Sequence, residues 1–177
     1  MGRRLAAIVG SAIFFVIAPG VVAGLAPYLI SGWRLRPPLL GLAPIRLAGA
    51  LLIILGLAAL ADSFARFAWQ GLGTPAPPFP TRRLVVTGLY RRVRNPMYVA
   101  VTAAILGQGL LLGDLRVIAY GAVVWVLFHL FVVAYEEPTL RRSFGADYET
   151  FRANVPRWIP RLTPWREGGG AGPESMP

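Results

Sequence analysis

Four long apolar segments constrain this chain more than any other feature. They cover residues 5–30, 47–69, 97–113 and 117–135, and the first of them contains no charged residue. A bilayer core requires about 20 apolar residues per helix, with roughly 17 to 25 tolerated. Only 15% of the residues are charged and the mean hydropathy is +0.57, whereas ordinary soluble domains carry about 25% charged residues. We therefore predict an all-α integral membrane protein with about four transmembrane helices.

Prolines and short connections predict how these helices are joined. Pro19 and Pro27 lie inside the first segment and should kink or divide it, which a bundle tolerates where neighbouring side chains satisfy the freed carbonyls. Residues 71–83 contain four prolines and should form an extended connector. Only "GDL" separates the third and fourth segments, so these two helices should form an antiparallel hairpin.

The basic residues, all 18 of which are arginine, predict the orientation. With both termini in the cytoplasm, Arg34, Arg36, Arg46 and Arg116 lie on the outer side and the other arginines on the cytoplasmic side. This distribution follows the positive-inside rule. The exclusive use of arginine is typical of a GC-rich genome, so we predict the inner membrane of a bacterium. No soluble domain remains to present a nucleic-acid surface.

The region after the fourth segment has the pattern of an amphipathic helix. Apolar residues recur at helical spacing and form one stripe: Leu140, Phe144, Tyr148, Phe151 and Val155. We predict a C-terminal amphipathic cytoplasmic helix that lies on the membrane or on the inner ends of the bundle. Residues 1–165 should form a single transmembrane domain, and residues 166–177 a disordered tail.

Two dipeptides are the strongest candidates for chemistry. Asn95 and Pro96 suit the N-cap and first position of a helix, where free backbone N–H groups favour an anion. Glu136 and Glu137 end the fourth segment, so their charges require a cation. That cation is either an arginine (Arg141 or Arg91) or a ligand. The hairpin brings both dipeptides together, which suits a ligand with a carboxylate and a positive centre, such as S-adenosylmethionine.

Other residues leave two interpretations open. His129 is either a general base or substrate contact, or a buried histidine bonded to a neighbouring group. Asp62 and Arg66 are spaced as a helical ion pair. The glycines of Gly107-Gln108-Gly109 allow close helix packing or the approach of a cofactor. With no cysteine and one histidine, the chain has no thiolate nucleophile, disulfide or multi-histidine metal site, so we predict no metal.

The segments "LVVTGLYRRVRNPMYVA" and "AYEEPTLRRSFGADYETFRANVPRWIP" resemble the isoprenylcysteine carboxyl methyltransferase and phospholipid N-methyltransferase superfamily of membrane enzymes. The resemblance covers roughly residues 82–160. It implies transfer of a methyl group from S-adenosylmethionine to a lipophilic acceptor from the bilayer: a lipid amine, an isoprenylcysteine-like carboxylate or another small nucleophile. It implies catalytic roles for Arg94, Asn95, Tyr98, Glu136 and Glu137. It implies cofactor contacts at Arg82, Arg83, Leu84, Val85, Tyr90, Asn95, Pro96, Met97, Tyr98 and Glu136.

Three positions depart from the pattern of that superfamily. Asn95 stands where the family has histidine, and Ala100 where it has glycine. Val132 stands where the isoprenylcysteine enzymes have an arginine for the substrate, which disfavours a prenylated cysteine carboxylate. Two alternatives remain open: a sterol-reductase-like enzyme that binds NADPH, and a non-catalytic membrane module that binds anionic lipid.

Overall fold

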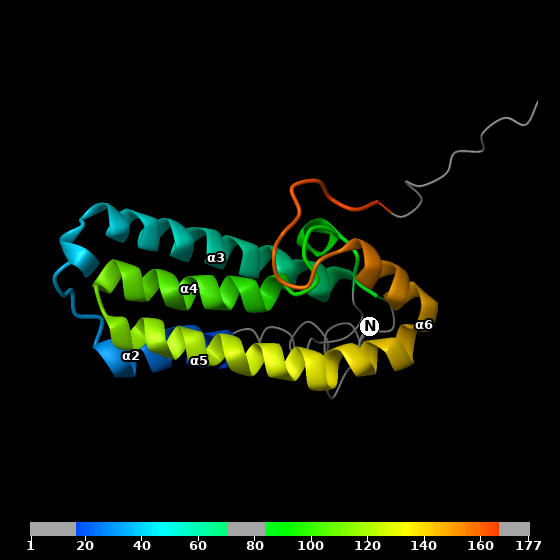
Figure 1. Ribbon diagram of the computed structural model, residues 1–177, viewed down its shortest axis with the longest axis horizontal. Coiled ribbons are helices and arrows are strands. Elements are labelled where there is room, and N and C mark those ends of the chain that lie inside the picture. Colours follow the sequence, from blue (N-terminus) through cyan, green and yellow to red (C-terminus); the bar gives the residue numbers. More distant parts are fainter. Residues whose placement is uncertain (1–16, 71–83, 167–177) are drawn as a thin grey trace, which may run out of the picture.

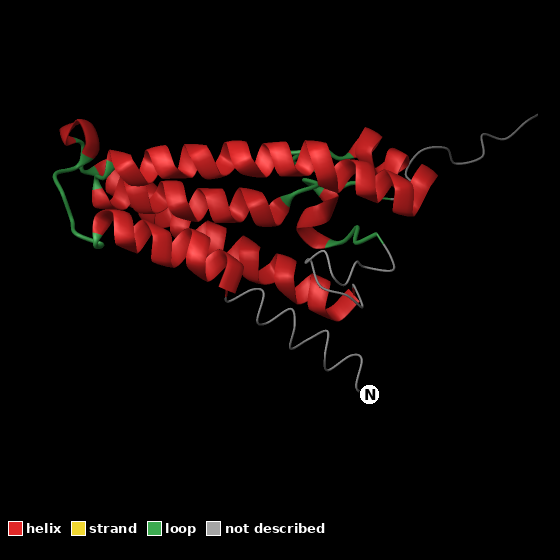
Figure 2. Ribbon diagram, turned by 90° about the horizontal axis from the view of Figure 1, so that it is seen from below, coloured by secondary structure: helices red, strands yellow, loops and turns green. Residues whose placement is uncertain are grey.

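The computed structural model describes residues 17–70 and 84–166, except for the side chains of residues 67–70. All regular elements in these residues are helical, and no strand is present among them. In chain order the elements are η1 (Gly20–Leu25), α2 (Ala26–Ser31), η2 (Leu39–Gly41), α3 (Pro44–Gln70), η3 (Gly88–Arg91), α4 (Pro96–Leu112), α5 (Leu115–Phe131), η4 (Val132–Glu136) and α6 (Glu137–Asn154). The long helices α3, α4 and α5 run lengthwise beside one another (Figures 1 and 2).

The described helices correspond to the predicted apolar segments, although residues 5–16 of the first segment lie outside the described residues. By length and composition, Pro44–Arg66 and Leu115–Asn154 are each sufficient to cross a membrane, and Ile17–Ser31 and Pro96–Leu112 are shorter apolar helices. Large apolar side chains remain exposed on the outside of the bundle, including Leu29 at 72%, Leu47 at 70% and Leu55 at 64%. Exposed apolar surface of this extent marks contact with a partner or a membrane. In the described residues the prediction of an all-helical protein is confirmed, with two candidate membrane-spanning helices.

The first helix is irregular at Pro27, as the sequence predicts. Because Pro27 has no N–H, it cannot donate to the carbonyl of Ala23, four residues earlier, as in an α-helix. It also cannot donate to the carbonyl of Val22, five residues earlier, as in a π-helix. Gln108 Nε2 from α4 donates to Ala23 O at 2.7 Å, and Tyr120 Oη from α5 donates to Val22 O at 2.9 Å. Side chains of neighbouring helices therefore complete the hydrogen bonding of this helix.

Glycines set the close approach of α3 and α4. A Cβ atom on Gly49 would lie 2.6 Å from Gly107 O, and one on Gly107 would lie 2.7 Å from Gly49 O. A Cβ atom on Gly56 would lie 2.8 Å from Ala100 O. Helices with small residues at their contact can pack backbone to backbone. The prediction of helix packing for Gly107 is confirmed, and its partner is α3.

The predicted hairpin between α4 and α5 is present. Gly113 ends α4 with a φ of 69°, and Asp114 caps α5 by accepting a bond from the Arg116 backbone N–H at 3.0 Å. The Asp114 side chain is 1% exposed and also pairs with the guanidinium groups of Arg116, at 2.7 Å, and Arg36, at 3.2 Å. The Asp114 carboxylate thus ties the loop before α3 to the α4–α5 turn.

We expect Asp114→Asn to lower the melting temperature in detergent by a few degrees at neutral pH. Asparagine caps a helix as well as aspartate, so the decrease in melting temperature measures the contribution of the negative charge of Asp114. Hydrogen bonding to Arg116, and the nearby charges of Arg116 and Arg36, lower the pKa of Asp114. A carboxylate whose pKa is lowered by folding stabilises the folded protein at pH values above its unfolded pKa of about 4. This contribution to stability is lost as the pH falls through the pKa of the folded state. The melting temperatures of the wild type and Asp114→Asn should therefore converge as the pH is lowered. A difference in melting temperature that does not change with pH would contradict this account.

The fourth apolar segment continues into α6 without a break. The sequence predicts a new helix or a sharp bend at Pro138. The first alternative is confirmed: Pro138 lies in the first turn of α6, where its missing N–H is tolerated, and a π-turn (η4) joins α5 to α6. Gly145, at φ 49° and ψ −122°, interrupts the regular geometry within α6. As a result, α6 turns back across the end of the bundle (Figure 1).

The predicted apolar stripe forms a second core at this end. Tyr148, Phe151 and Val155 are at most 3% exposed. The partly buried residues packed against them are Leu84, Val86, Leu140, Phe144 and Trp165. The stripe thus packs on the segment that precedes α4 and on the C-terminal segment.

Candidate active site

Two segments far apart in the sequence pair at the end of the bundle beside α6. Residues 91–94 precede α4, and residues 156–165, here called the C-terminal strap, follow α6. The backbone N–H of Arg94 donates to Pro156 O at 2.9 Å, that of Arg161 to Arg92 O at 2.9 Å, and that of Trp165 to Arg91 O at 2.8 Å. These main-chain bonds fix the strap beside the start of α4.

Asn95 and Pro96 occupy the predicted start of a helix, but the Asn95 side chain does not cap it. Asn95 is the N-cap residue by position, without a side-chain cap hydrogen bond, and α4 begins at Pro96. Asn95 Nδ2 instead donates to Arg157 O at 3.2 Å, and the residue is 8% exposed. The predicted helix start is therefore confirmed, and the Asn95 amide binds the strap rather than the backbone of its own helix. The proposed anion site at this helix start stays a prediction.

The two adjacent glutamates have different environments. Tyr98, in the first turns of α4, donates its hydroxyl to Glu136 Oε2 at 2.9 Å, and its ring packs 4.8 Å from that of Phe128. Among the described residues no arginine pairs with Glu136. The hairpin therefore brings Tyr98 and Glu136 together, as the sequence predicts.

Glu137 is held by two arginines. Arg94 Nη1 lies 2.9 Å from Glu137 Oε1, and the Arg157 guanidinium binds both carboxylate oxygens, at 2.6 and 3.0 Å. The Glu137 side chain is 9% exposed and that of Arg94 10%. Hydrogen bonding to Glu137 raises the pKa of Arg157 further. The predicted partners, Arg141 and Arg91, are wrong: Arg141 pairs with Glu149 on the same helix, at 2.9 Å.

Tyr148 and Arg157 were not predicted as members of this cluster. Arg94 Nη1 also donates to the Tyr148 hydroxyl at 3.3 Å. Tyr148 belongs to the apolar stripe, which gives no sign of its polar contact. Arg157 lies between prolines, 20 residues after Glu137, and no local spacing connects the two. Only the pairing of the strap with residues 91–94 brings Arg157 to the glutamate.

His129 and the Asp62–Arg66 pair make contacts that do not involve the two glutamates. His129 Nδ1 accepts a hydrogen bond from Trp158 Nε1 at 3.1 Å, and the Trp158 ring also packs 4.5 Å from that of Trp125. This contact favours the interpretation of His129 as a side chain bonded to a neighbour. Arg66 and Asp62 form the predicted ion pair at 2.8 Å.

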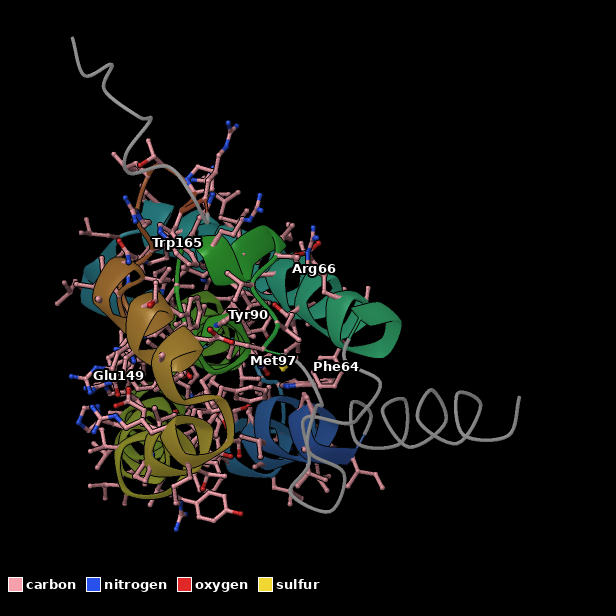
Figure 3. All side chains as sticks on the ribbon, turned by 90° about the vertical axis from the view of Figure 1, so that its right-hand side faces the viewer. Phe64, Arg66, Tyr90, Met97, Glu149 and Trp165 are labelled. Carbon is pink, nitrogen blue, oxygen red and sulfur yellow. The ribbon has the colours of Figure 1, made fainter. Side chains whose placement is uncertain are left out.

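The remaining predicted cofactor residues surround the start of α4. Val85 and Tyr90 are 8% and 6% exposed, and burial raises the pKa of Tyr90 well above its ordinary value. Leu84 packs in the second core, and Met97 packs on the core between α3, α4 and α5. Viewed from this end, Tyr90 and Met97 lie between α6 and α3 (Figure 3). Arg82 and Arg83 lie outside the described residues.

In the described part of the chain, no group of three or more histidine, aspartate or glutamate side chains is arranged to hold a metal ion. The polar groups that converge are two carboxylates, two guanidinium groups, two tyrosine hydroxyls and one amide. Such a set suits binding of a ligand that carries charges of both signs.

Comparison with protein-family models identifies a methyltransferase family. Residues 45–147, more than half of the chain, match the family model described as phospholipid methyltransferase. This range contains α4, Tyr98 and both glutamates.

Curated relatives match over a shorter region. Protein-S-isoprenylcysteine O-methyltransferase from Schizosaccharomyces pombe is 37% identical over 80 residues, which is 45% of this chain and 34% of the relative. Protein-S-isoprenylcysteine O-methyltransferase B from Arabidopsis thaliana is 33% identical over 79 residues, 44% of this chain and 40% of the relative. The nickel-cobalt-cadmium resistance protein NccN from Alcaligenes xylosoxydans xylosoxydans is 30% identical over 83 residues, 47% of this chain and 38% of the relative. The chain thus matches well under half the length of each of these relatives.

Proposed function

The chain belongs to the phospholipid methyltransferase family, and from this premise we propose that it transfers a methyl group from S-adenosylmethionine to a lipophilic acceptor at a membrane interface. The observation that carries the proposal is the environment of Glu136. Its carboxylate accepts a bond from Tyr98, but within the described residues it has no cationic partner, whereas Glu137 beside it has two. An ammonium or sulfonium group of the ligand would supply the missing charge.

The other side chains of the cluster would position the ligand site. Tyr98 orients the Glu136 carboxylate by its hydrogen bond. Glu137 holds Arg94 and Arg157 in place, and Asn95 binds the backbone of the strap. The start of α4 offers free backbone N–H groups for a carboxylate. When bound, S-adenosylmethionine supplies a methyl group on a positively charged sulfur. The protein's task is then to align this methyl group with a lone pair on the acceptor.

The distribution of arginines supports a cytoplasmic position for this end of the bundle. Arg91, Arg92, Arg94, Arg157 and Arg161 lie at or near the strap. Arg36, Arg46 and Arg116 lie at the opposite end, where Arg46 donates to Arg36 O and the other two pair with Asp114. With the positive-inside rule, we propose four spans, both termini in the cytoplasm and location in a bacterial inner membrane. The acceptor would arrive laterally from the lipid.

The environment of Val132 bears on the identity of the acceptor. Val132, at the position of the substrate arginine in the isoprenylcysteine enzymes, is 1% exposed and packed in the π-turn. This apolar environment favours a lipid amine or another nucleophile over a prenylated cysteine carboxylate. The match to a methyltransferase family does not favour the sterol-reductase-like and lipid-binding alternatives.

The experiment that tests the proposal uses the purified full chain in detergent. We expect S-adenosylmethionine and S-adenosylhomocysteine to raise its melting temperature, because a ligand that binds only the folded state stabilises it, and NADPH to leave the temperature unchanged. With labelled S-adenosylmethionine, the label should appear in a total lipid extract. Stabilisation by NADPH alone, or by anionic lipid alone with no labelled product, would contradict the proposed function.

A further inference from the structure

A second feature of the bundle lies apart from the glutamates: a cavity of about 540 Å³ between the first helix, α3 and α4. Its lining residues are Pro19, Gly20, Ala23, Gly24, Trp33, Ile53, Leu57, Leu60, Ala104, Gln108, Leu111 and Leu112. Trp33, Leu111 and Leu112 belong to the end of the bundle opposite the strap. The cavity thus runs from the middle of the bundle toward the other membrane face.

Two of the four residues that the first helix contributes to the cavity wall are glycines. Gly20 and Gly24 both line the cavity, and a Cβ atom on either would meet no atom within 4 Å. In this respect they differ from Gly49 and Gly107, whose Cβ atoms would clash with a facing backbone. The two glycines of the first helix therefore leave space that no described part of the protein fills.

The cavity presents no free hydrogen-bonding side chain among its described lining residues. The amide of Gln108 is fully engaged: Nε2 donates to Ala23 O, and Oε1 accepts from Trp33 Nε1 at 3.2 Å. Trp33 in turn packs edge-on against Tyr28, with ring centroids 5.4 Å apart. An apolar cavity with no free polar partner holds water poorly and takes apolar ligands.

We propose that this cavity binds one hydrocarbon chain of a membrane amphiphile, with the chain end toward Trp33. Its volume lies within the range of small-molecule sites. A methylene group occupies a volume similar to the ~30 Å³ of a water molecule in the liquid, so the cavity holds roughly 18 such groups. This number corresponds to one long alkyl or isoprenoid chain and not to the two chains of a phospholipid. The neighbouring helices are apolar on their outer faces, so the chain enters from the bilayer.

The test uses a palmitoyl-length alcohol with a photoreactive diazirine at its chain end, added to the full protein in lipid nanodiscs. Mass spectrometry should locate the label on residues of the cavity wall, such as Ile53, Leu57 and Leu111. Gly24→Leu should abolish this labelling, because Gly24 lines the cavity and a Cβ atom there meets no atom within 4 Å, so the added side chain can occupy the space. Gly20→Leu is a second variant of the same kind. Ala122→Leu, at an exposed position of α5, is the matched control and should leave labelling unchanged.

Three outcomes would overturn the inference. The first is equal labelling in Gly24→Leu, Gly20→Leu and the wild type. The second is labelling of the wild type that is confined to residues outside the cavity wall. The third is a dimer that both glycine variants abolish, since the occupant is then a helix of a second copy, packed on small residues. Affinity for S-adenosylhomocysteine should not change in either variant, so failure here and failure of the proposed function are distinguishable.

Discussion

Glu137→Ala is expected to destabilise the protein more than any other single substitution in the cluster, lowering its melting temperature by about 10 °C. The Glu137 carboxylate is 9% exposed and pairs with Arg94, which is itself 10% exposed, and with Arg157. Removing one partner of a buried ion pair typically costs about 3–5 kcal/mol, because the other charge remains buried without compensation. In a chain of this size, about 1 kcal/mol corresponds to roughly 2–4 °C.

The measurement is thermal unfolding of the full chain in detergent without ligand. Glu149→Ala is the matched control, because Glu149 also pairs with two arginines, Arg141 and Arg152, but its side chain is 50% exposed. Exposed pairs contribute about 1 kcal/mol or less, so this variant should unfold within a few degrees of the wild type. Equal melting temperatures for the two variants would show that Glu137 does not hold the strap to the bundle.

Glu136→Gln is expected to weaken binding of S-adenosylmethionine by about 10- to 100-fold while leaving the melting temperature of the ligand-free protein within a few degrees of the wild type. A hydrogen bond to a charged group contributes about 1.5–3 kcal/mol, which corresponds to this change in affinity. In contrast to Glu137, no arginine in the described structure would lose its partner. Tyr98→Ala should weaken binding as well, because it removes the hydroxyl that orients the carboxylate.

Calorimetric titration with two ligands would identify the group that Glu136 binds. S-adenosylmethionine has an ammonium and a sulfonium, whereas S-adenosylhomocysteine has only the ammonium. Weaker binding of both ligands by Glu136→Gln indicates contact with the ammonium, and weaker binding of S-adenosylmethionine alone indicates the sulfonium. Asp147→Asn, at an exposed position on α6, is the control and should bind both normally. Unchanged affinity of Glu136→Gln and Tyr98→Ala for both ligands would refute the assigned site.

Much of the fold could be predicted from the sequence because bilayer-length apolar segments admit few arrangements. The segment 97–113 corresponds to α4 (Pro96–Leu112), and 47–69 to α3 (Pro44–Gln70). The "GDL" connection also determined the hairpin, and the hairpin determined the Tyr98–Glu136 contact. These features follow from local length and turn chemistry, which one sequence contains.

The roles of the two glutamates could not be predicted in the same way. Adjacent carboxylates look equivalent in the sequence, but Glu137 finds Arg94 and Arg157, which lie 43 and 20 residues away. The Asn95 amide likewise binds the strap at Arg157 rather than its own helix. Such contacts depend on where the chain returns after α6. The continuation of the helix through Pro138 depends on a π-turn, for which the sequence has no recognisable pattern.

The pairing of the strap with residues 91–94 has a consequence for biosynthesis. Chains emerge from the ribosome N-terminus first, so the apolar helices are all made before Pro156, Arg157 and Trp165 appear. Until then Glu137 lacks one of its arginines, the backbone N–H of Arg94 lacks its acceptor on the strap, and the carbonyls of Arg91 and Arg92 lack the N–H donors that the strap supplies. The proposed ligand site is therefore completed last, after the apolar helices have been made. A chain terminated before Pro156 would keep its membrane helices but lack an assembled binding site.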